Sequence, residues 1–165
     1  MRDEHLHGDR VQLRPVLEPD VDRLVAIRCS PSVTRWWGEL DEPSWPLADQ
    51  GTEARAVWVG EALVGFVQWH EEADPRYRHA GLDLFLAEEA QGCGLGREVV
   101  SVVVEHLLSL GHHRVVIDPA TANEAAIACY AACGFRPVGV MRQYERDGDG
   151  VGWHDGLLME LVVET

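Results

Sequence analysis

The sequence predicts an α/β fold in which helices flank one mixed β-sheet. Three observations carry this prediction: short strand-like runs alternate with helical apolar stripes, glycine or proline marks each change, and three glycines in five residues separate one strand from the next helix. The 165 residues are enough for one domain with a real core and too few for two comfortable ones. We therefore expect a single domain over residues 1–165.

The first third of the chain predicts one strand and two helices. Residues 11–16 alternate apolar and polar side chains well enough for a strand. Residues 18–31 carry a helical apolar stripe, with Asp20 as the candidate N-cap and Pro31 beyond the end. Residues 32–51 hold three tryptophans, two prolines and two glycines, which indicates a short helix followed by a loop.

The remaining two thirds alternate strands and helices. The expected elements are a hairpin at 56–72 that turns at Gly60 and Glu61, a strand at 79–87, a helix from Gly96 to Leu110 closed by Gly111, a strand at 113–120 stopped by Pro119, a helix at 122–135 closed by Gly134, and a hairpin at 137–164 with its tip at 147–152. The central strand–helix–strand unit should pair in parallel and cross right-handed.

The charge of the chain bounds its partners. Twenty-eight acidic residues face fourteen basic ones, a formal net charge of −14. Such a field repels nucleic acid and anionic membranes and attracts a cationic ligand, although solubility alone also accounts for it. No apolar run is long enough to span a bilayer, and the polar beginning "MRDEHLHGDR" carries no signal-peptide core. We expect a cytoplasmic protein that binds neither nucleic acid nor membrane.

Cysteine and histidine usage predicts neither disulfides nor a metal site. None of the four cysteines forms a Cys-x-x-Cys pair, and buried small-hydrophobe roles are expected for Cys29, Cys129 and Cys133. The pair His112 and His113 has no Cys or carboxylate partner at ligand spacing.

The glycine cluster indicates an anion-binding site. Glycine costs conformational entropy on folding, and a loop whose N–H groups all face one anion explains three of them before a helix. No Lys-Ser/Thr follows, which excludes a P-loop, and the later glycine of the dinucleotide fingerprint is missing. The remaining pattern is Gln-x-x-Gly-x-Gly from Gln91 to Gly96; the alternative is a tight turn without a ligand.

This pattern and "ATANEAAIACYAACGF" together resemble the GNAT family of acyl-CoA-dependent N-acetyltransferases. The family's pyrophosphate loop reads Arg/Gln-x-x-Gly-x-Gly/Ala, and its later helix matches this chain at Asn123, Ala126, Tyr130, Gly134 and Phe135. The resemblance covers nearly the whole chain. It implies the GNAT fold, a central mixed sheet that splays open between flanking helices, with acetyl-CoA as cosubstrate and no metal.

The resemblance assigns a donor site. It implies that the N–H groups of the loop hold the pyrophosphate; the loop residues are Gln91, Gly92, Cys93, Gly94, Leu95 and Gly96. Leu86 and Glu88 would offer backbone contacts to the pantetheine, with Glu88 standing where many members have proline. Asn123 and Ala126 would contact the cofactor, although Asn123 could serve as an N-cap alone. Cys93 is expected to be structural because no base lies beside it in the sequence.

The transfer of an acetyl group from a thioester to an amine needs an acid and a base. Tyr130 matches the family tyrosine near the thioester sulfur, which implies a general acid; the alternative is a packed helix tyrosine. Asp83 lies in the otherwise apolar strand "GLDLFLA", where a lone carboxylate is costly unless it is paired or functional. Asp118 ends the next strand, and it could also simply start the turn before Pro119.

"WWGELDEP", "QWHEEADPRYRHAGLDLFLA" and "VIDPATANEAAIACYAACGF" together look like the aminoglycoside 6'-N-acetyltransferases. This resemblance implies Asp83 as base, Asp118 as a contact to the substrate amine, and Trp37 and Trp69 as walls for the sugar rings. A short segment after Trp37 and the absence of Asp-Gly-Trp-Trp depart from the subgroup and put the substrate in doubt. The alternatives are a GNAT enzyme for another amine (a metabolite, a siderophore lysine or a protein N-terminus) and a module that only binds acyl-CoA. The chain would be a monomer or a homodimer.

Overall fold

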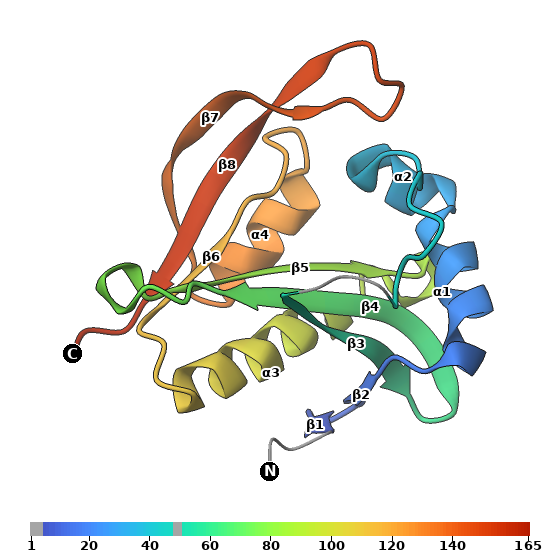
Figure 1. Ribbon diagram of the computed structural model, residues 1–165, viewed down its shortest axis with the longest axis horizontal. Coiled ribbons are helices and arrows are strands. Elements are labelled where there is room, and N and C mark those ends of the chain that lie inside the picture. Colours follow the sequence, from blue (N-terminus) through green and yellow to red (C-terminus); the bar gives the residue numbers. More distant parts are fainter. Residues whose placement is uncertain (1–4, 48–50) are drawn as a thin grey trace.

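The computed structural model describes residues 5–47 and 51–165, which form one eight-stranded mixed sheet flanked by helices (Figure 1). The strands are β1 (Leu6–His7), β2 (Val11–Pro15), β3 (Thr52–Val59), β4 (Ala62–Glu71), β5 (Ala80–Leu86), β6 (Arg114–Ile117), β7 (Arg136–Arg146) and β8 (Trp153–Val162). The helices are α1 (Val21–Arg28), α2 (Pro31–Trp37), α3 (Leu95–Ser109) and α4 (Glu124–Ala132). Short 3₁₀ turns cover Glu18–Asp20, Pro75–Tyr77 and Glu88–Ala90.

The predicted α/β class and the order of the main elements are confirmed. Two details at the beginning differ from the prediction. The short strand β1 pairs with β2 and was not anticipated, because two residues carry no readable period. Asp20 occupies the predicted N-cap position of α1, but its side chain makes no capping hydrogen bond; the carboxylate instead accepts the N–H of Leu17 at 2.9 Å across the preceding 3₁₀ turn. Pro31, expected beyond α1, opens α2 after Ser30.

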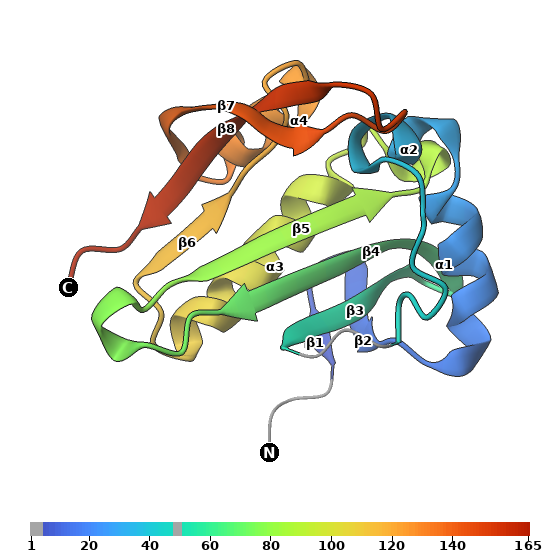
Figure 2. The same ribbon diagram turned by 45° about the horizontal axis from the view of Figure 1, so that its top comes forward.

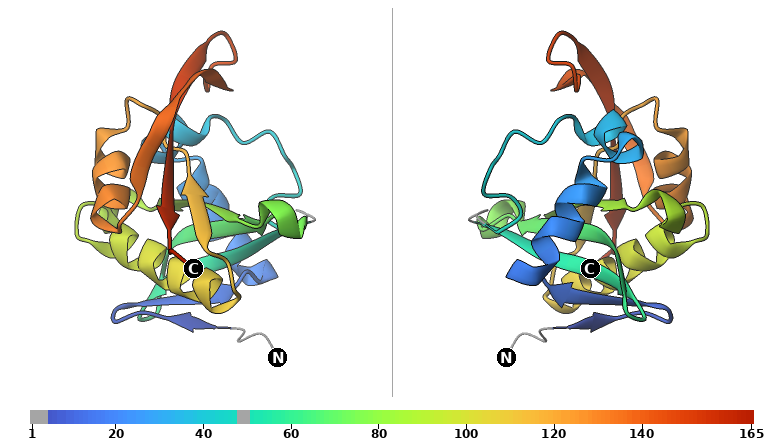
Figure 3. Two further views of the ribbon diagram at one scale, coloured as in Figure 1. Left: turned by 90° about the vertical axis from the view of Figure 1, so that its left-hand side faces the viewer. Right: turned by 90° about the vertical axis from the view of Figure 1, so that its right-hand side faces the viewer.

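The helices divide between the two faces of the sheet (Figure 3). On one face α3 and α4 cover a large core that includes Val11, Val67, Val99 and Leu107. On the other face α1 and α2 cover a smaller core around Leu24, Phe66 and Phe85. No helix in the described part of the chain is long and apolar enough to cross a membrane.

The sheet splays open between β5 and β6. In the strand order β1-β2-β3-β4-β5-β6-β8-β7, this is the parallel pair, and it pairs only at Ala80 with Val115 and at Gly81 with Val116. Beyond those residues β5 stays with β4 as far as Leu86, while β6 stays with β8 (Figure 2). The ends of β5 and β6 therefore stand apart, as the family resemblance implied.

The end of α4 shows why the sequence places Gly-Phe after this helix. Gly134 has φ +100°, a left-handed conformation that favours glycine, and its N–H donates to the carbonyl of Ala131. The next N–H, of Phe135, donates to the carbonyl of Tyr130 at 3.1 Å. The predicted helix stop is confirmed, and it fixes the turn that carries Tyr130.

Candidate active site

A cavity of about 990 Å³ opens where β5 and β6 part. Its wall comes from α2, β5, the glycine loop, the first turn of α3, the end of β6, α4 and β7. The predicted site residues that line it are Trp37, Asp83, Leu86, Gln91, Gly92, Gly94, Gly96, Asp118, Asn123, Ala126 and Tyr130. The structure thus gathers donor and acceptor candidates from distant parts of the sequence in one pocket.

The glycine loop presents free amides at the start of α3. Gly94 is the N-cap, with φ +83°, and the first helical hydrogen bond runs from the N–H of Glu98 to its carbonyl at 3.2 Å. The amides of the first turn before Glu98 have no helical acceptor and lie at the positive end of the helix dipole. This arrangement suits a bound anion such as a pyrophosphate.

Three side chains connect the glycine loop to the protein around it, those of Gln91, Cys93 and Leu95. The Gln91 amide donates to the carbonyl of Leu86 at 2.9 Å, which ties the loop to the end of β5. The Cys93 thiol donates to the carbonyl of Ala90 at 3.2 Å, and Leu95 belongs to the core. Neither Cys93 nor Leu95 lines the cavity, so only their backbone could serve a ligand there.

The prediction for Glu88 was wrong. β5 ends at Leu86, the N–H of Ala87 donates back to Val64 at 2.7 Å, and the chain then enters a 3₁₀ turn at Glu88. Glu88 is exposed and lies off the cavity lining. The predicted strand ran to Ala87, one residue past the observed end, because nothing in "LFLAEE" marks this turn.

Asn123 caps α4 beside the cavity. Its side-chain oxygen accepts the N–H of Ala126 at 3.2 Å, and both residues line the pocket. The N-cap reading of Asn123 is therefore observed, and a further contact to a cofactor remains a prediction.

Tyr130 is buried on the pocket wall, with 9% of its surface exposed. Its ring lies 6.3 Å from that of Phe135. Burial, followed by the neighbouring Cys129 and Asp83, raises the pKa of its phenol well above the ordinary value. The hydroxyl therefore stays protonated at neutral pH and can donate a proton.

Two carboxylates, one on β5 and one just after β6, lie at the same level along the two neighbouring strands. Asp83 lies three residues beyond Ala80 on β5, and Asp118 lies three beyond its partner Val115. Burial, followed by the charges of Asp118 and Glu145, raises the pKa of Asp83 to about 7, although a hydrogen bond from Gln68 acts in the opposite direction. A carboxylate with this pKa can accept a proton from an amine near neutral pH.

β7 contributes two pocket residues that sequence reasoning missed. The Tyr144 hydroxyl donates to Asp118 Oδ2 at 2.6 Å, and this bond, with burial, raises the pKa of Tyr144 to about 12. Glu145 follows and adds a third carboxylate to the lining. The register between β7 and β8 shifts between Met141 and Glu145. A predicted hairpin with regular alternation gives no signal for this shift.

A comparison with known families decides the identity. The family model described as "Acetyltransferase (GNAT) family" matches residues 21–135, from α1 through the glycine loop to the end of α4. The chain belongs to the GNAT family. It is an acetyl-CoA-dependent N-acetyltransferase.

Individual relatives support this family and differ in what they act on. This acetyltransferase is 29% identical over 158 residues to aminoglycoside N(6')-acetyltransferase type 1 of Klebsiella pneumoniae, covering 81% of this chain and 78% of the relative. The solved AAC(6')-Ib in complex with paromomycin and acetyl-CoA has a TM-score of 0.74 at 25% identity, covering 93% of this chain and 94% of that one. Spermidine N-acetyltransferase from Vibrio cholerae, solved with CoA and spermine, has a TM-score of 0.79 at 19% identity, covering 94% and 96%. The last likeness shows the fold alone.

Of the two tryptophans predicted as walls for the sugar rings, one lines the pocket of this acetyltransferase and the other does not. Trp37 lines the pocket and packs edge-on against Phe85, with ring centroids 5.1 Å apart. The prediction for Trp69 was wrong: 1% of its surface is exposed, and its ring packs against His106 of α3 in the core. Side chains alternate along a strand, so Gln68 faces Asp83 and its neighbour Trp69 faces the other side of the sheet.

The cysteines and histidines of the described residues do not gather into a potential metal site. Within residues 5–47 and 51–165, no group of three or more His, Cys, Asp or Glu side chains gathers as a metal site would require. His112 is buried and pairs with Glu71 at 2.8 Å. Cys129 and Cys133 are partly buried, whereas Cys29 is exposed, against the prediction. Its position after the last residue of α1 turns it outward.

Proposed function

We propose that this enzyme transfers the acetyl group of acetyl-CoA to the 6'-amine of an aminoglycoside by direct attack in a ternary complex. One observation carries the proposal. Three carboxylates, Asp83, Asp118 and Glu145, share a pocket with the protonated Tyr130 and the helix N-terminus at Gly94. The pocket therefore combines an anion site for the donor with an acidic site for a cationic acceptor.

The donor half uses the backbone. The free amides of the loop and of the first turn of α3 would hold the pyrophosphate of acetyl-CoA. The pantetheine would then run between the end of β5 at Leu86 and α4 at Asn123 and Ala126, all of which line the cavity. This path leads from the loop toward Tyr130.

The Gly96→Val variant is expected to raise the KM for acetyl-CoA about tenfold or more and to leave the fold intact. A Cβ at Gly96 would lie 3.7 Å from Cys129 Sγ and from Leu86 Cδ1, an ordinary contact, so the backbone tolerates it while the branched side chain takes up donor space. Gly94 is a poorer choice because its φ of +83° strains any other residue.

Steady-state kinetics with varied acetyl-CoA measure this effect. Gly139→Val is the matched control, because a Cβ there meets nothing within 4 Å and Gly139 lies off the cavity lining. A folded Gly96→Val enzyme with an unchanged KM for acetyl-CoA would contradict the proposed donor site.

The acceptor half combines charge and one aromatic wall. Asp83 would take the proton of the attacking amine, and Asp118, held by Tyr144, would orient it. Trp37 offers an apolar face on the same lining, which suits a sugar ring bearing ammonium groups. Likeness to the aminoglycoside N(6')-acetyltransferase of Klebsiella pneumoniae supports this acceptor.

A linear polyamine is the second candidate acceptor. The three pocket carboxylates would equally attract such a chain, and the spermidine N-acetyltransferase of Vibrio cholerae shares the fold. A polyamine has no ring to place against Trp37, which is the feature that favours the aminoglycoside.

Thiol release from acetyl-CoA, measured with a panel of acceptors, tests the proposal. We expect turnover on aminoglycosides with a free 6'-amine, with a kcat/KM that falls as salt rises, because exposed charges are screened beyond about 8 Å at physiological ionic strength. The KM for acetyl-CoA should change less. Turnover on spermidine but on no 6'-amino compound would leave the family assignment standing and remove the antibiotic.

A further inference from the structure

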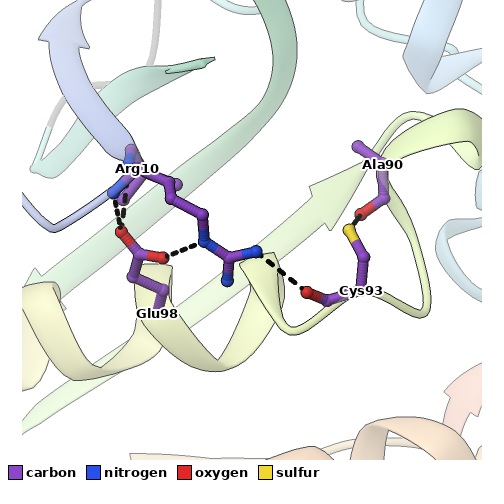
Figure 4. A network of polar contacts seen from close by, with 5 residues as sticks. Arg10, Ala90, Cys93 and Glu98 are labelled. Carbon is purple, nitrogen blue, oxygen red and sulfur yellow. Dashed lines mark hydrogen bonds and ion pairs between the residues drawn. The ribbon is translucent and has the colours of Figure 1, made fainter.

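Arg10 ties the N-terminal strands to the glycine loop (Figure 4). Its Nε donates to Glu98 Oε2 at 2.9 Å, and its Nη1 donates to the carbonyl of Cys93 at 3.0 Å. Glu98 Oε1 also accepts the backbone N–H groups of Arg10, at 2.6 Å, and Val11, at 3.0 Å. One guanidinium thus joins the first turns of α3 to the middle of the loop.

The bond to Cys93 sets the direction of the next amide. In a trans peptide the carbonyl of one residue and the N–H of the next point in opposite directions. Cys93 lies off the cavity lining, whereas Gly92 and Gly94 lie on it. When Arg10 holds the Cys93 carbonyl on the outer side, the Gly94 N–H turns toward the pocket.

Glu98 is the ionised partner of Arg10 in this contact. Burial opposes its ionisation, but the hydrogen bonds from Arg10 and Val11 outweigh burial and lower its pKa below the ordinary value. Its negative charge therefore stands in the first turn of α3, close to the proposed anion site. Arg10 pairs with that carboxylate at 2.9 Å and so offsets its charge beside the proposed anion site.

We infer that Arg10 and Glu98 are positioning residues for the donor site, which orient the loop amides toward the pyrophosphate of acetyl-CoA without lining the cavity themselves. The inference rests on the proposed donor site at the loop. A guanidinium is required because its fork reaches the carboxylate and the carbonyl together, which the single ammonium of lysine does not do.

The test is calorimetric titration of the full chain with CoA and with dephospho-CoA, which keeps the pyrophosphate and lacks the 3'-phosphate. The variants are Arg10→Met and Arg10→Lys. Arg76→Met is the matched control, because Arg76 pairs with Asp74 in the exposed turn between β4 and β5 and lies off the cavity lining. We expect both Arg10 variants to bind CoA and dephospho-CoA about tenfold more weakly, and the control to bind as the wild type does.

Kinetics separate positioning from damage to the fold. The KM for acetyl-CoA should rise in both Arg10 variants, while kcat at saturating donor and the KM for the amine stay near the wild-type values. Because Arg10→Lys keeps the charge at this exposed position, it also covers the case in which Arg10→Met folds poorly.

Each of the remaining outcomes of the titration would refute one specific part of this inference. Wild-type affinity for CoA in both Arg10 variants would refute the positioning role. Wild-type affinity in Arg10→Lys alone would show that charge suffices. A loss with CoA but none with dephospho-CoA would make Arg10 a direct contact to the 3'-phosphate. If the wild type binds no CoA, or if Gly96→Val binds it normally, the proposed donor site itself fails.

Discussion

Replacing Tyr130 with phenylalanine is expected to lower kcat by about 10²- to 10⁴-fold, the usual worth of a positioned general acid. The change keeps the ring that packs near Phe135 and removes only the hydroxyl. The thiolate of CoA then leaves without a proton donor at hand. The KM values should change little, because the phenol serves the departing sulfur rather than ground-state binding.

Tyr77→Phe is the matched control for this experiment. Tyr77 is exposed in the turn between β4 and β5 and lies off the cavity lining, so its loss should leave kcat unchanged. A Tyr130→Phe enzyme with the kcat of the wild type would make Tyr130 a packing residue, held by the helix stop at Gly134 and by burial alone.

Replacing Asp83 with asparagine is expected to lower kcat/KM by a similar factor and to remove a limb of the pH profile. A base must be deprotonated to accept a proton, so kcat/KM of the wild type should rise with pH up to about 7, the pKa of Asp83, and then level off. Asparagine has nothing to titrate there. Asp118→Asn should cost less, because Asp118 is assigned to orientation and is held by Tyr144.

The opposite result for the two aspartate variants would exchange the roles assigned to Asp83 and Asp118. An active Asp83→Asn enzyme beside an inactive Asp118→Asn enzyme would make Asp118 the base. A pH limb near 7 that survives in Asp83→Asn would assign that titration to another group.

Thermal unfolding shows whether Asp83→Asn loses activity without losing stability. The pKa of Asp83 is raised from 3.8 to about 7, so between these values the native state holds a proton that the unfolded chain releases. The wild type therefore loses stability as the pH rises through this window, by about 1.4 kcal/mol for each pKa unit. The asparagine variant lacks this loss, and its Tm relative to the wild type should be higher at pH 8 than at pH 4.

The fold was predictable where local signals and burial agree. The strand, glycine loop and helix between Ala80 and Ser109 follow from glycine placement and helical apolar periodicity, and the end of α4 follows from Gly134. Asp83 was recognisable because a carboxylate in an apolar strand needs a reason. These features depend on residues that are neighbours in the sequence.

The missed features depend on residues that meet only in the folded chain. Trp69 lies one position from Gln68, whose side chain hydrogen-bonds to Asp83, and the sequence does not say which face of β4 turns toward Asp83. Tyr144 and Glu145 reach the pocket through a register shift that hairpin patterning does not reveal. Arg10 meets Cys93 across 83 residues of chain.

Product analysis with two acceptors tests the central claim most directly. The acceptors are a matched aminoglycoside pair that differ only in carrying an amine or a hydroxyl at the 6' position, each incubated with acetyl-CoA and the full chain. The account predicts that the 6'-amino compound gains one acetyl group, located on the 6'-nitrogen, and that the 6'-hydroxyl compound gains none. Acetylation of both compounds at another nitrogen, or of neither while a linear polyamine is acetylated, would contradict it.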